Sequence, residues 1–221
     1  MSSALHDRRF AAFLFDMDGT VIDSIAAANR IWARWATGHG LDPSEVLAVI
    51  HGVRAADTIR RFTPPGTDVD LEAERLTRAE IDDLDGVIEI PGARRFLDSL
   101  PPDRWAIVTS APRELARRRM AAAGVPIPEV LVTAEDVRRG KPFPDAFIAA
   151  AETLGVLVAD CLIWEDSPAG IAAAEASGGS VIVVSATHAE PISTQHPTIK
   201  DYESLVVDVD PDGQLRVRPT N

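Results

Sequence analysis

The chain has 221 residues, enough for one large α/β domain or for a core with a small inserted unit. Its formal net charge of −12 argues against nucleic acid or an anionic membrane as a partner. No apolar stretch is long enough to span a bilayer, and a single cysteine, Cys161, excludes a disulfide framework. We therefore expect a soluble, cytoplasmic protein that binds neither nucleic acid nor membrane. We also expect a monomer.

The first predicted element is a buried strand that ends in two aspartates. The apolar run from Phe10 to Phe15 is typical of such a strand, and Asp16 and Asp18 follow it. Both carboxylates point to the same side of an extended chain, and Gly19 permits a sharp exit. This pair could bind Mg²⁺, with one aspartate as nucleophile and the other as acid/base. Taken alone, a strand followed by an Asp-Gly turn explains the motif equally well.

Residues 23–86 are predicted to form an all-helical insertion. Helical patterns, which no strand interrupts, cover residues 25–35, 45–50, 55–62 and 71–83. Hinges near residues 22–24 and 85–91 would join this insertion to the rest of the chain. We therefore predict a core domain of residues 1–22 and 87–221 and a helical cap domain between them.

Beyond the insertion, buried strands alternate with helices. The predicted strands cover residues 105–108, 130–132, 161–164 and 181–184. One predicted helix begins at residue 91, and three more cover residues 112–123, 144–154 and 168–176. Residues 205–209 and 215–217 predict a late strand and an edge hairpin. This alternation implies right-handed crossovers, so the expected fold class is α/β, with a doubly wound, parallel, Rossmann-like sheet.

Polar residues also follow two later strands of this predicted sheet. Thr109-Ser110 ends one strand and Glu165-Asp166 ends another. The carboxyl ends of parallel strands meet at one edge of a sheet, where helix N-termini also aim backbone N–H groups. Thr109 and Ser110 could bind phosphate oxygens there, and Glu165 or Asp166 could complete a magnesium shell with Asp16. Each pair alone is also typical of a helix N-cap.

Lys141 is one of only two lysines among the 22 basic residues. It lies in a Gly-Lys-Pro loop before a predicted helix. A compact ammonium at this place would balance an aspartate nucleophile, a second aspartate and a dianionic phosphate. A solvated surface lysine is the ordinary alternative, but a chain that uses arginine by default favours a specific role.

Together, and in this order, the four motifs resemble the signature of the haloacid-dehalogenase-like superfamily, in its phosphatase branch with a helical cap. The D-x-D-G-T motif stands at residues 16–20, and Thr109, Lys141 and Glu165-Asp166 follow it. The resemblance covers residues 10–190 and implies a magnesium-dependent hydrolase of small phosphorylated metabolites.

The resemblance also implies a role for each motif residue. Asp16 would attack phosphorus and become an aspartyl phosphate, while Asp18 would protonate the leaving alkoxide and then deprotonate water. The phosphate-binding residues would be Gly19, Thr109, Ser110 and Lys141. Mg²⁺ would bind Asp16, the Asp18 carbonyl and Asp166, with Glu165 nearby.

The cap segment around Gly52 is predicted to decide the substrate. Gly52 interrupts the helical pattern, and His51 and Arg54 lie beside it. Hydrogen-bond donors of this loop could bind the hydroxyl groups of a sugar or polyol phosphate when the cap closes. The segment is similar to the cap of glycerol-phosphate and hexose-phosphate phosphatases, including 2-deoxyglucose-6-phosphate phosphatases. A loop with exposed polar groups is the alternative.

Several other activities fit the same scaffold. Asp18 argues against a dehalogenase, and the absence of lysine from residues 23–86 argues against a phosphonatase that uses a cap lysine. A non-catalytic phosphate-binding regulator predicts loss of Asp18 or Lys141, and both are present. A β-phosphoglucomutase remains the main alternative, because it differs only in whether water or a second sugar hydroxyl reaches the phosphoaspartate.

Overall fold

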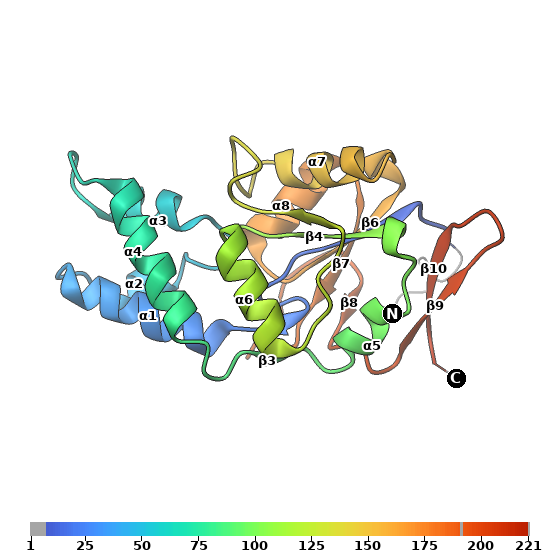
Figure 1. The fold of residues 1–221 in the computed structure, drawn as a ribbon, viewed down its shortest axis with the longest axis horizontal. Coiled ribbons are helices and arrows are strands. Elements are labelled where there is room, and N and C mark those ends of the chain that lie inside the picture. The colour runs from blue at the N-terminus through green and yellow to red at the C-terminus, as the bar shows by residue number, and fades with distance from the viewer. Residues whose placement is uncertain (1–7, 191, 221) are drawn as a thin grey trace.

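The computed structural model describes residues 8–190 and 192–220, and a six-stranded parallel sheet lies at its centre (Figure 1). The strand order is β5-β4-β1-β6-β7-β8. These strands are β1 (Ala12–Phe15), β4 (Trp105–Val108), β5 (Val130–Val132), β6 (Cys161–Glu165), β7 (Ser180–Val184) and β8 (Thr198–Ile199). The parallel pairing and the crossover helices confirm the predicted α/β fold class.

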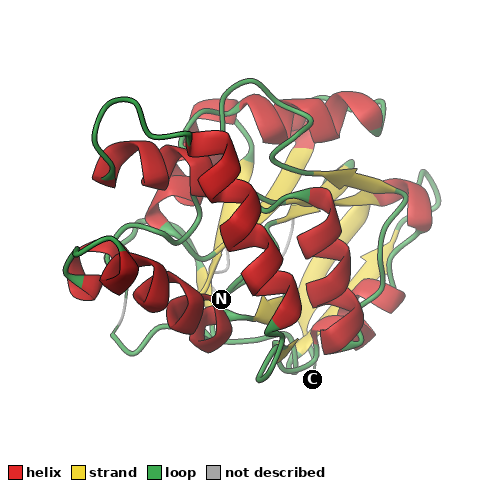
Figure 2. Ribbon diagram, turned by 60° about the vertical axis from the view of Figure 1, so that its left-hand side comes forward, coloured by secondary structure: helices red, strands yellow, loops and turns green. Residues whose placement is uncertain are grey.

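Helices cover both faces of this sheet (Figure 2). On β1, Phe13 and Phe15 belong to one buried cluster, and Ala12 and Leu14 belong to another, because side chains alternate along a strand. The first cluster includes residues of α5 (Ala93–Asp98) and α6 (Arg113–Ala123). The second includes residues of α7 (Asp145–Thr153) and α8 (Pro168–Ser177). Strands that are buried on both faces explain why the sequence shows continuous apolar runs.

Four further helices pack with one another at one end of the molecule, on the left in Figure 1. They are α1 (Ile25–Gly38), α2 (Pro43–Leu47), α3 (Ala55–Phe62) and α4 (Val69–Asp82). Their shared apolar cluster includes Ile31, Trp32, Ile59 and Leu76. A two-stranded antiparallel ribbon, β2 (Ile22–Asp23) with β3 (Ile88–Glu89), lies where the chain enters and leaves this group. We propose that these helices are the cap domain.

The structure differs from the sequence prediction mainly in short elements. The helix expected at residues 45–50 begins at Pro43 and ends at Leu47, before a loop in which Gly52 has φ +78°. Helix α4 begins earlier than expected because the Asp68 carboxylate caps it by accepting the Leu71 amide at 3.1 Å. Strands β3 and β8, of two residues each, were not predicted, because two residues carry no periodicity to recognise.

The C-terminal residues form the expected antiparallel hairpin, β9 (Leu205–Val209) with β10 (Leu215–Pro219). The hairpin is a separate two-stranded sheet and not an edge of the large one. It is tied to the start of the chain, because Phe10 exchanges backbone hydrogen bonds of 2.9 and 2.8 Å with Leu215. This contact explains why the first apolar run begins at Phe10 although β1 begins at Ala12.

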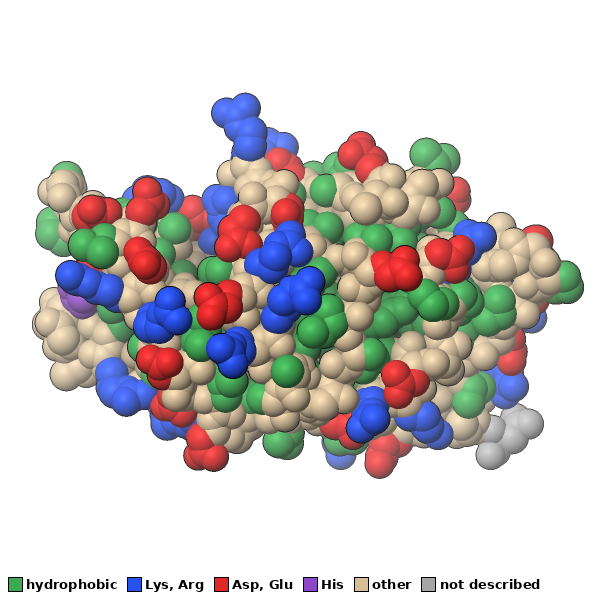
Figure 3. Space-filling model, viewed as in Figure 1, with side chains coloured by type: hydrophobic (Ala, Val, Ile, Leu, Met, Phe, Trp, Pro, Cys, Tyr) green, Lys and Arg blue, Asp and Glu red, His purple; other side chains and the backbone are tan. Residues whose placement is uncertain are grey.

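The surface charges are mixed in sign. On the face drawn in Figure 3, acidic and basic side chains are interspersed and do not gather into one charged patch. On the helical group, for example, Arg30 and Arg34 both pair with Asp83, at 2.6 and 2.9 Å. Across residues 8–190 and 192–220, none of the helices combines the length and the apolar character that crossing a membrane requires.

Candidate active site

A buried ionic cluster lies at the carboxyl end of the central strands, around Lys141. The Lys141 Nζ contacts the Asp16 carboxylate and donates to Glu165 Oε1 at 2.6 Å and to the Val108 carbonyl at 3.1 Å. Burial alone would lower the pKa of Lys141, but the two carboxylates outweigh burial and raise it. The ammonium therefore stays charged and fixes the position of both carboxylates.

Three carboxylates in this cluster could hold a metal ion. Single oxygen atoms of Asp16, Glu165 and Asp166 lie within 4.8 Å of one another. Burial raises the pKa of Asp16 well above its ordinary value; Lys141 opposes this effect, and the carboxylates of Glu165 and Asp166 add to it. Burial also raises the pKa of Asp166 to about 6, although His188 and then Lys141 act in the opposite direction. One ammonium does not balance three buried carboxylates. An all-oxygen donor set with excess negative charge fits a hard divalent cation such as Mg²⁺.

Glu165 is held on both of its oxygens by the protein itself. Oε1 accepts from Lys141, and Oε2 accepts the backbone amides of Asp166 and Ser167 at 2.8 and 2.9 Å. The side chain is fully buried and lies directly against Gly170 of α8, where a Cβ atom would overlap it. Glu165 therefore holds Lys141 and the start of α8 in position, and both of its oxygens already accept hydrogen bonds from the protein.

We expect Gly170→Ala to destabilise the protein by about 1–3 kcal/mol, because the added methyl group overpacks against the Glu165 carboxylate. Urea unfolding followed by circular dichroism measures this loss. Gly38→Ala is the matched control, since nothing lies within 4 Å of the added Cβ, and it should be neutral or slightly stabilising. Equal stability of the two variants would contradict the close packing of Glu165 on α8.

The structure gives Gly19 a different role from the expected phosphate contact. Its amide donates to the Ile22 carbonyl at 2.7 Å, so that N–H group closes a turn. Its φ of +88° and the Asp166 carboxylate, which a Cβ would overlap, both require glycine. Gly19 therefore allows the loop after β1 to approach Asp166 closely.

Asp18 lies beside Asp16 in sequence but has separate partners. Its Oδ1 accepts the Ser24 hydroxyl at 2.5 Å and Arg119 Nη1 at 3.0 Å. Arg119 extends from α6, and its Nη2 donates to Glu80 Oε1 of α4 at 2.9 Å. Oδ1 accepts both of these hydrogen bonds, and Oδ2 has no hydrogen-bond partner among residues 8–190 and 192–220.

The sequence analysis missed Glu80 and Arg119, although helical spacing points to both. Arg119 stands three and four residues after Ala116 and Leu115, which are buried on α6. Glu80 stands four residues after Leu76, which is buried on α4. A charged residue in the buried stripe of a helix is unusual and indicates a partner.

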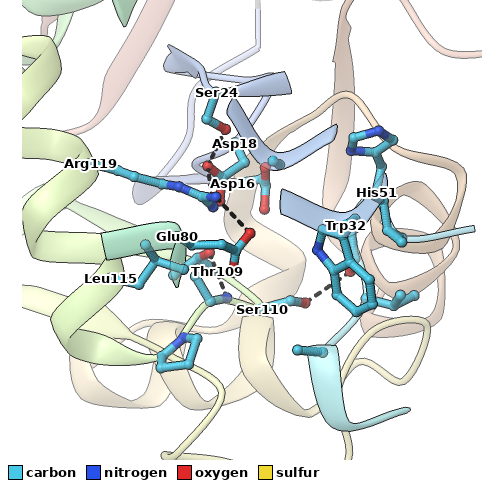
Figure 4. Close-up of a pocket in the computed structure, with 17 residues that line it drawn as sticks. Asp16, Asp18, Ser24, Trp32, His51, Glu80, Thr109, Ser110, Leu115 and Arg119 are labelled. Carbon is cyan, nitrogen blue, oxygen red and sulfur yellow. Dashed lines mark hydrogen bonds and ion pairs between the residues drawn. The ribbon is translucent and has the colours of Figure 1, made fainter. Parts of the chain in front are cut away.

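These side chains line a small cavity of about 70 Å³ between the helical group and the sheet edge. Figure 4 shows Arg119 and Glu80 on one side of the pocket, with Trp32 and His51 on the other. Asp16 and Asp18 lie between them in this view. Burial lowers the pKa of His51, an effect that the Asp18 charge opposes. The His51 ring is therefore neutral at neutral pH.

Thr109 and Ser110 also line this cavity, as expected, and both have partners within the protein. The Thr109 hydroxyl oxygen accepts the Ala111 amide at 3.0 Å. The Ser110 hydroxyl donates to the carbonyl of Gly52 at 2.9 Å, which links the loop after β4 to the loop of the helical group. Gly52 lies so close to Ser167 that a Cβ atom would overlap the Ser167 hydroxyl.

Arg54 does not line this cavity, although the sequence prediction grouped it with His51 and Gly52. Its Nε and Nη2 donate to the Asp57 carboxylate at 2.8 and 3.3 Å, and its Nη1 donates to the Arg138 carbonyl at 3.1 Å. The Arg54 side chain packs over Gly140, where an added Cβ would stand 2.7 Å from Nε. Arg54 therefore joins the helical group to the loop that carries Lys141.

Comparison with known proteins gives a consistent result. A family model described as haloacid dehalogenase-like hydrolase matches residues 10–178. Hexitol phosphatase A of Escherichia coli K12 is 41% identical over 215 residues, which are 95% of this chain and 100% of that protein. Glycerol-1-phosphate phosphohydrolase 2 of Saccharomyces cerevisiae is 32% identical over 187 residues, 80% of this chain and 75% of that protein.

Solved structures resemble the chain in fold. A β-phosphoglucomutase from Clostridium difficile has a TM-score of 0.75 and covers 87% of this chain and 91% of its own. Its sequence identity is 18%, so the likeness concerns the fold and not the reaction.

Proposed function

Because the chain belongs to the haloacid dehalogenase-like hydrolases, we propose that it is a magnesium-dependent phosphatase of small sugar or polyol phosphates. The relatives named as hexitol and glycerol-1-phosphate phosphatases support this class of substrate, the former over 95% of this chain. They also support the resemblance of the cap segment around Gly52 to the caps of glycerol-phosphate and hexose-phosphate phosphatases.

In the proposed reaction, an oxygen of Asp16 attacks phosphorus and the bond to the leaving alkoxide breaks, which leaves an aspartyl phosphate. Water then attacks this phosphorus, releases inorganic phosphate and restores the Asp16 carboxylate. The contact with the Lys141 ammonium holds Asp16 in place, and the ammonium offsets the charge of the incoming phosphate. Thr109 and Ser110, which line the same cavity, are the proposed contacts of the phosphoryl oxygens.

Asp18 is the proposed acid/base. It protonates the leaving alkoxide in the first half of the reaction and takes a proton from water in the second. Since Ser24 and Arg119 both bind Oδ1, the oxygen that exchanges protons with the substrate is Oδ2. Ser24 and Arg119 thus orient the carboxylate without occupying its reactive oxygen.

The proposed ligands of Mg²⁺ are the Asp16 and Asp166 carboxylates and the Asp18 carbonyl. Glu165 is close enough to belong to the same carboxylate cluster, but its own oxygens are bound by Lys141 and backbone amides. When bound, Mg²⁺ would neutralise charge on the transferring phosphoryl group.

The helical cap is proposed to open and close over the site. A cavity of about 70 Å³ is far below the ~300–1,000 Å³ of typical small-molecule pockets, so a hexitol phosphate requires a more open arrangement to enter. His51 and Gly52 belong to the loop that would cover the substrate, and Arg54 would hold this loop on the core. Closure excludes water other than the one that reacts.

The observation that carries the proposal is the cluster of Lys141 with Asp16, Glu165 and Asp166, beside a separately held Asp18. The test is release of inorganic phosphate from a panel of hexitol, glycerol and hexose phosphates. We expect hydrolysis with Mg²⁺ and near-complete loss with a chelator, restored when Mg²⁺ is added back. Transfer of label from glucose 1,6-bisphosphate to β-glucose 1-phosphate, with little phosphate release, would identify a mutase instead.

A further inference from the structure

An ion pair between cap and core stands at the wall of the cavity beside Asp18. Arg119 of α6 donates to Glu80 of α4 at 2.9 Å and to Asp18 at 3.0 Å. The side chains of Arg119 and Glu80 are only 6% and 7% exposed. The pair therefore lies next to the carboxylate proposed to serve the leaving oxygen, and both of its residues line the cavity (Figure 4).

This pair retains hydrogen-bonding capacity that the protein does not use. Arg119 Nε is buried and has no hydrogen-bond partner among the described residues. Arg119 binds one oxygen of Glu80; the second oxygen accepts no hydrogen bond from the described residues and, unlike Arg119 Nε, is not fully buried. A buried donor is seldom left unpaired, so Arg119 Nε, together with the free acceptor oxygen of Glu80, points to a ligand that supplies both complements. A hydroxyl group does so, because it donates one hydrogen bond and accepts others.

We propose that Glu80 and Arg119 bind a hydroxyl group of the leaving group, close to the ester oxygen, and so select polyol and sugar phosphates. The substrate hydroxyl donates to Glu80 and accepts from Arg119 Nε. This inference rests on the proposed phosphatase function and adds the residues that choose its substrate class. Trp32, 5% exposed on the other side of the cavity, offers an apolar face to the carbon chain.

Such a pair discriminates strongly because it is buried. A phosphomonoester without the hydroxyl would leave Arg119 Nε, a buried donor, and the second oxygen of Glu80 without a partner. Sites built to hydrogen-bond a substrate hydroxyl reject the analogue that lacks it far better than apolar pockets reject a methylene. Since Glu80 is on the cap, discrimination also requires the closed arrangement.

The test compares kcat/KM for glycerol 1-phosphate with kcat/KM for propyl phosphate, which lacks both hydroxyls. In Glu80→Met, which keeps length but removes the acceptor, we expect the ratio of the two values to fall by about tenfold or more. Glu74→Met is the matched control, because Glu74 is exposed on the same helix, and it should keep the wild-type ratio. An equal loss on both compounds would overturn the inference and leave Glu80 as a residue that only positions Arg119.

If circular dichroism shows that Glu80→Met is not folded, Glu80→Gln provides the test. It keeps one acceptor oxygen but loses the charge, so a smaller fall in the ratio supports the inference and an unchanged ratio overturns it. Wild-type protein that hydrolyses glycerol 1-phosphate and propyl phosphate equally well also overturns it, while the proposed function stands. Wild-type protein inactive on both and on p-nitrophenyl phosphate would refute the proposed function, and the inference with it.

Discussion

Asp16→Asn is expected to lower magnesium-dependent phosphate release by about 10⁴-fold or more, because an amide does not form the proposed aspartyl phosphate. Asparagine preserves the shape of the side chain and an oxygen for Lys141, so folding should be intact. Steady-state phosphate release under saturating substrate measures the loss. Activity near the wild-type value would show that Asp16 is not the nucleophile.

The same substitution is expected to raise the stability of the folded protein while it lowers activity. A loss of activity in Asp16→Asn therefore cannot be explained by unfolding. Burial raises the pKa of Asp16 in the folded protein even though Lys141 opposes this effect, so folding with the carboxylate ionised costs free energy at neutral and alkaline pH. Asparagine carries no charge and removes this cost. Metal-free Asp16→Asn should therefore unfold at a higher temperature than the wild type. The difference should shrink as pH falls toward the ordinary aspartate pKa, because the wild-type carboxyl group is then protonated.

Sequence patterns predicted the sheet well, for a physical reason. Strands such as Trp105–Val108 and Val130–Val132 are apolar on both faces and end in polar or turn residues, so their bounds are visible in the sequence. The motif residues were also placed together correctly at one edge, because parallel strands present their carboxyl ends on the same side. Short pairings such as Ile22 with Glu89 carry no such pattern and depend on tertiary packing.

The limits of sequence reasoning lie where the helical group meets the large sheet. Arg54 belongs to the same loop as His51, but its backbone position directs the side chain to Asp57 and the Arg138 carbonyl and away from the cavity. Conversely, Glu80 and Arg119 are 39 residues apart in the chain and meet only where the helical group packs on the rest of the protein. Local periodicity does not predict which helices contact one another. It does indicate that both residues are buried, because each lies on the apolar face of its helix.

Lys141→Met is the substitution with the largest expected effect on folding and activity together. It leaves the Asp16 and Glu165 carboxylates buried without their ammonium, and breaking a buried ion pair in this way costs about 3–5 kcal/mol. It also removes a positive charge from the proposed site of phosphoryl transfer, and we expect this to lower kcat by roughly 10²–10³-fold. Urea unfolding and steady-state kinetics on the folded fraction measure the two effects separately.

Lys200→Met provides a matched control, because Lys200 is the other lysine of the chain and is exposed. It makes the same change in net charge at the surface and should leave stability and kcat close to wild type. Added Mg²⁺ should recover part of the lost stability of Lys141→Met, since a divalent cation compensates the same carboxylates, but it should not restore kcat. Recovery of both would mean that Lys141 only balances charge, whereas recovery of stability alone would show that the ammonium must stand beside Asp16 during phosphoryl transfer.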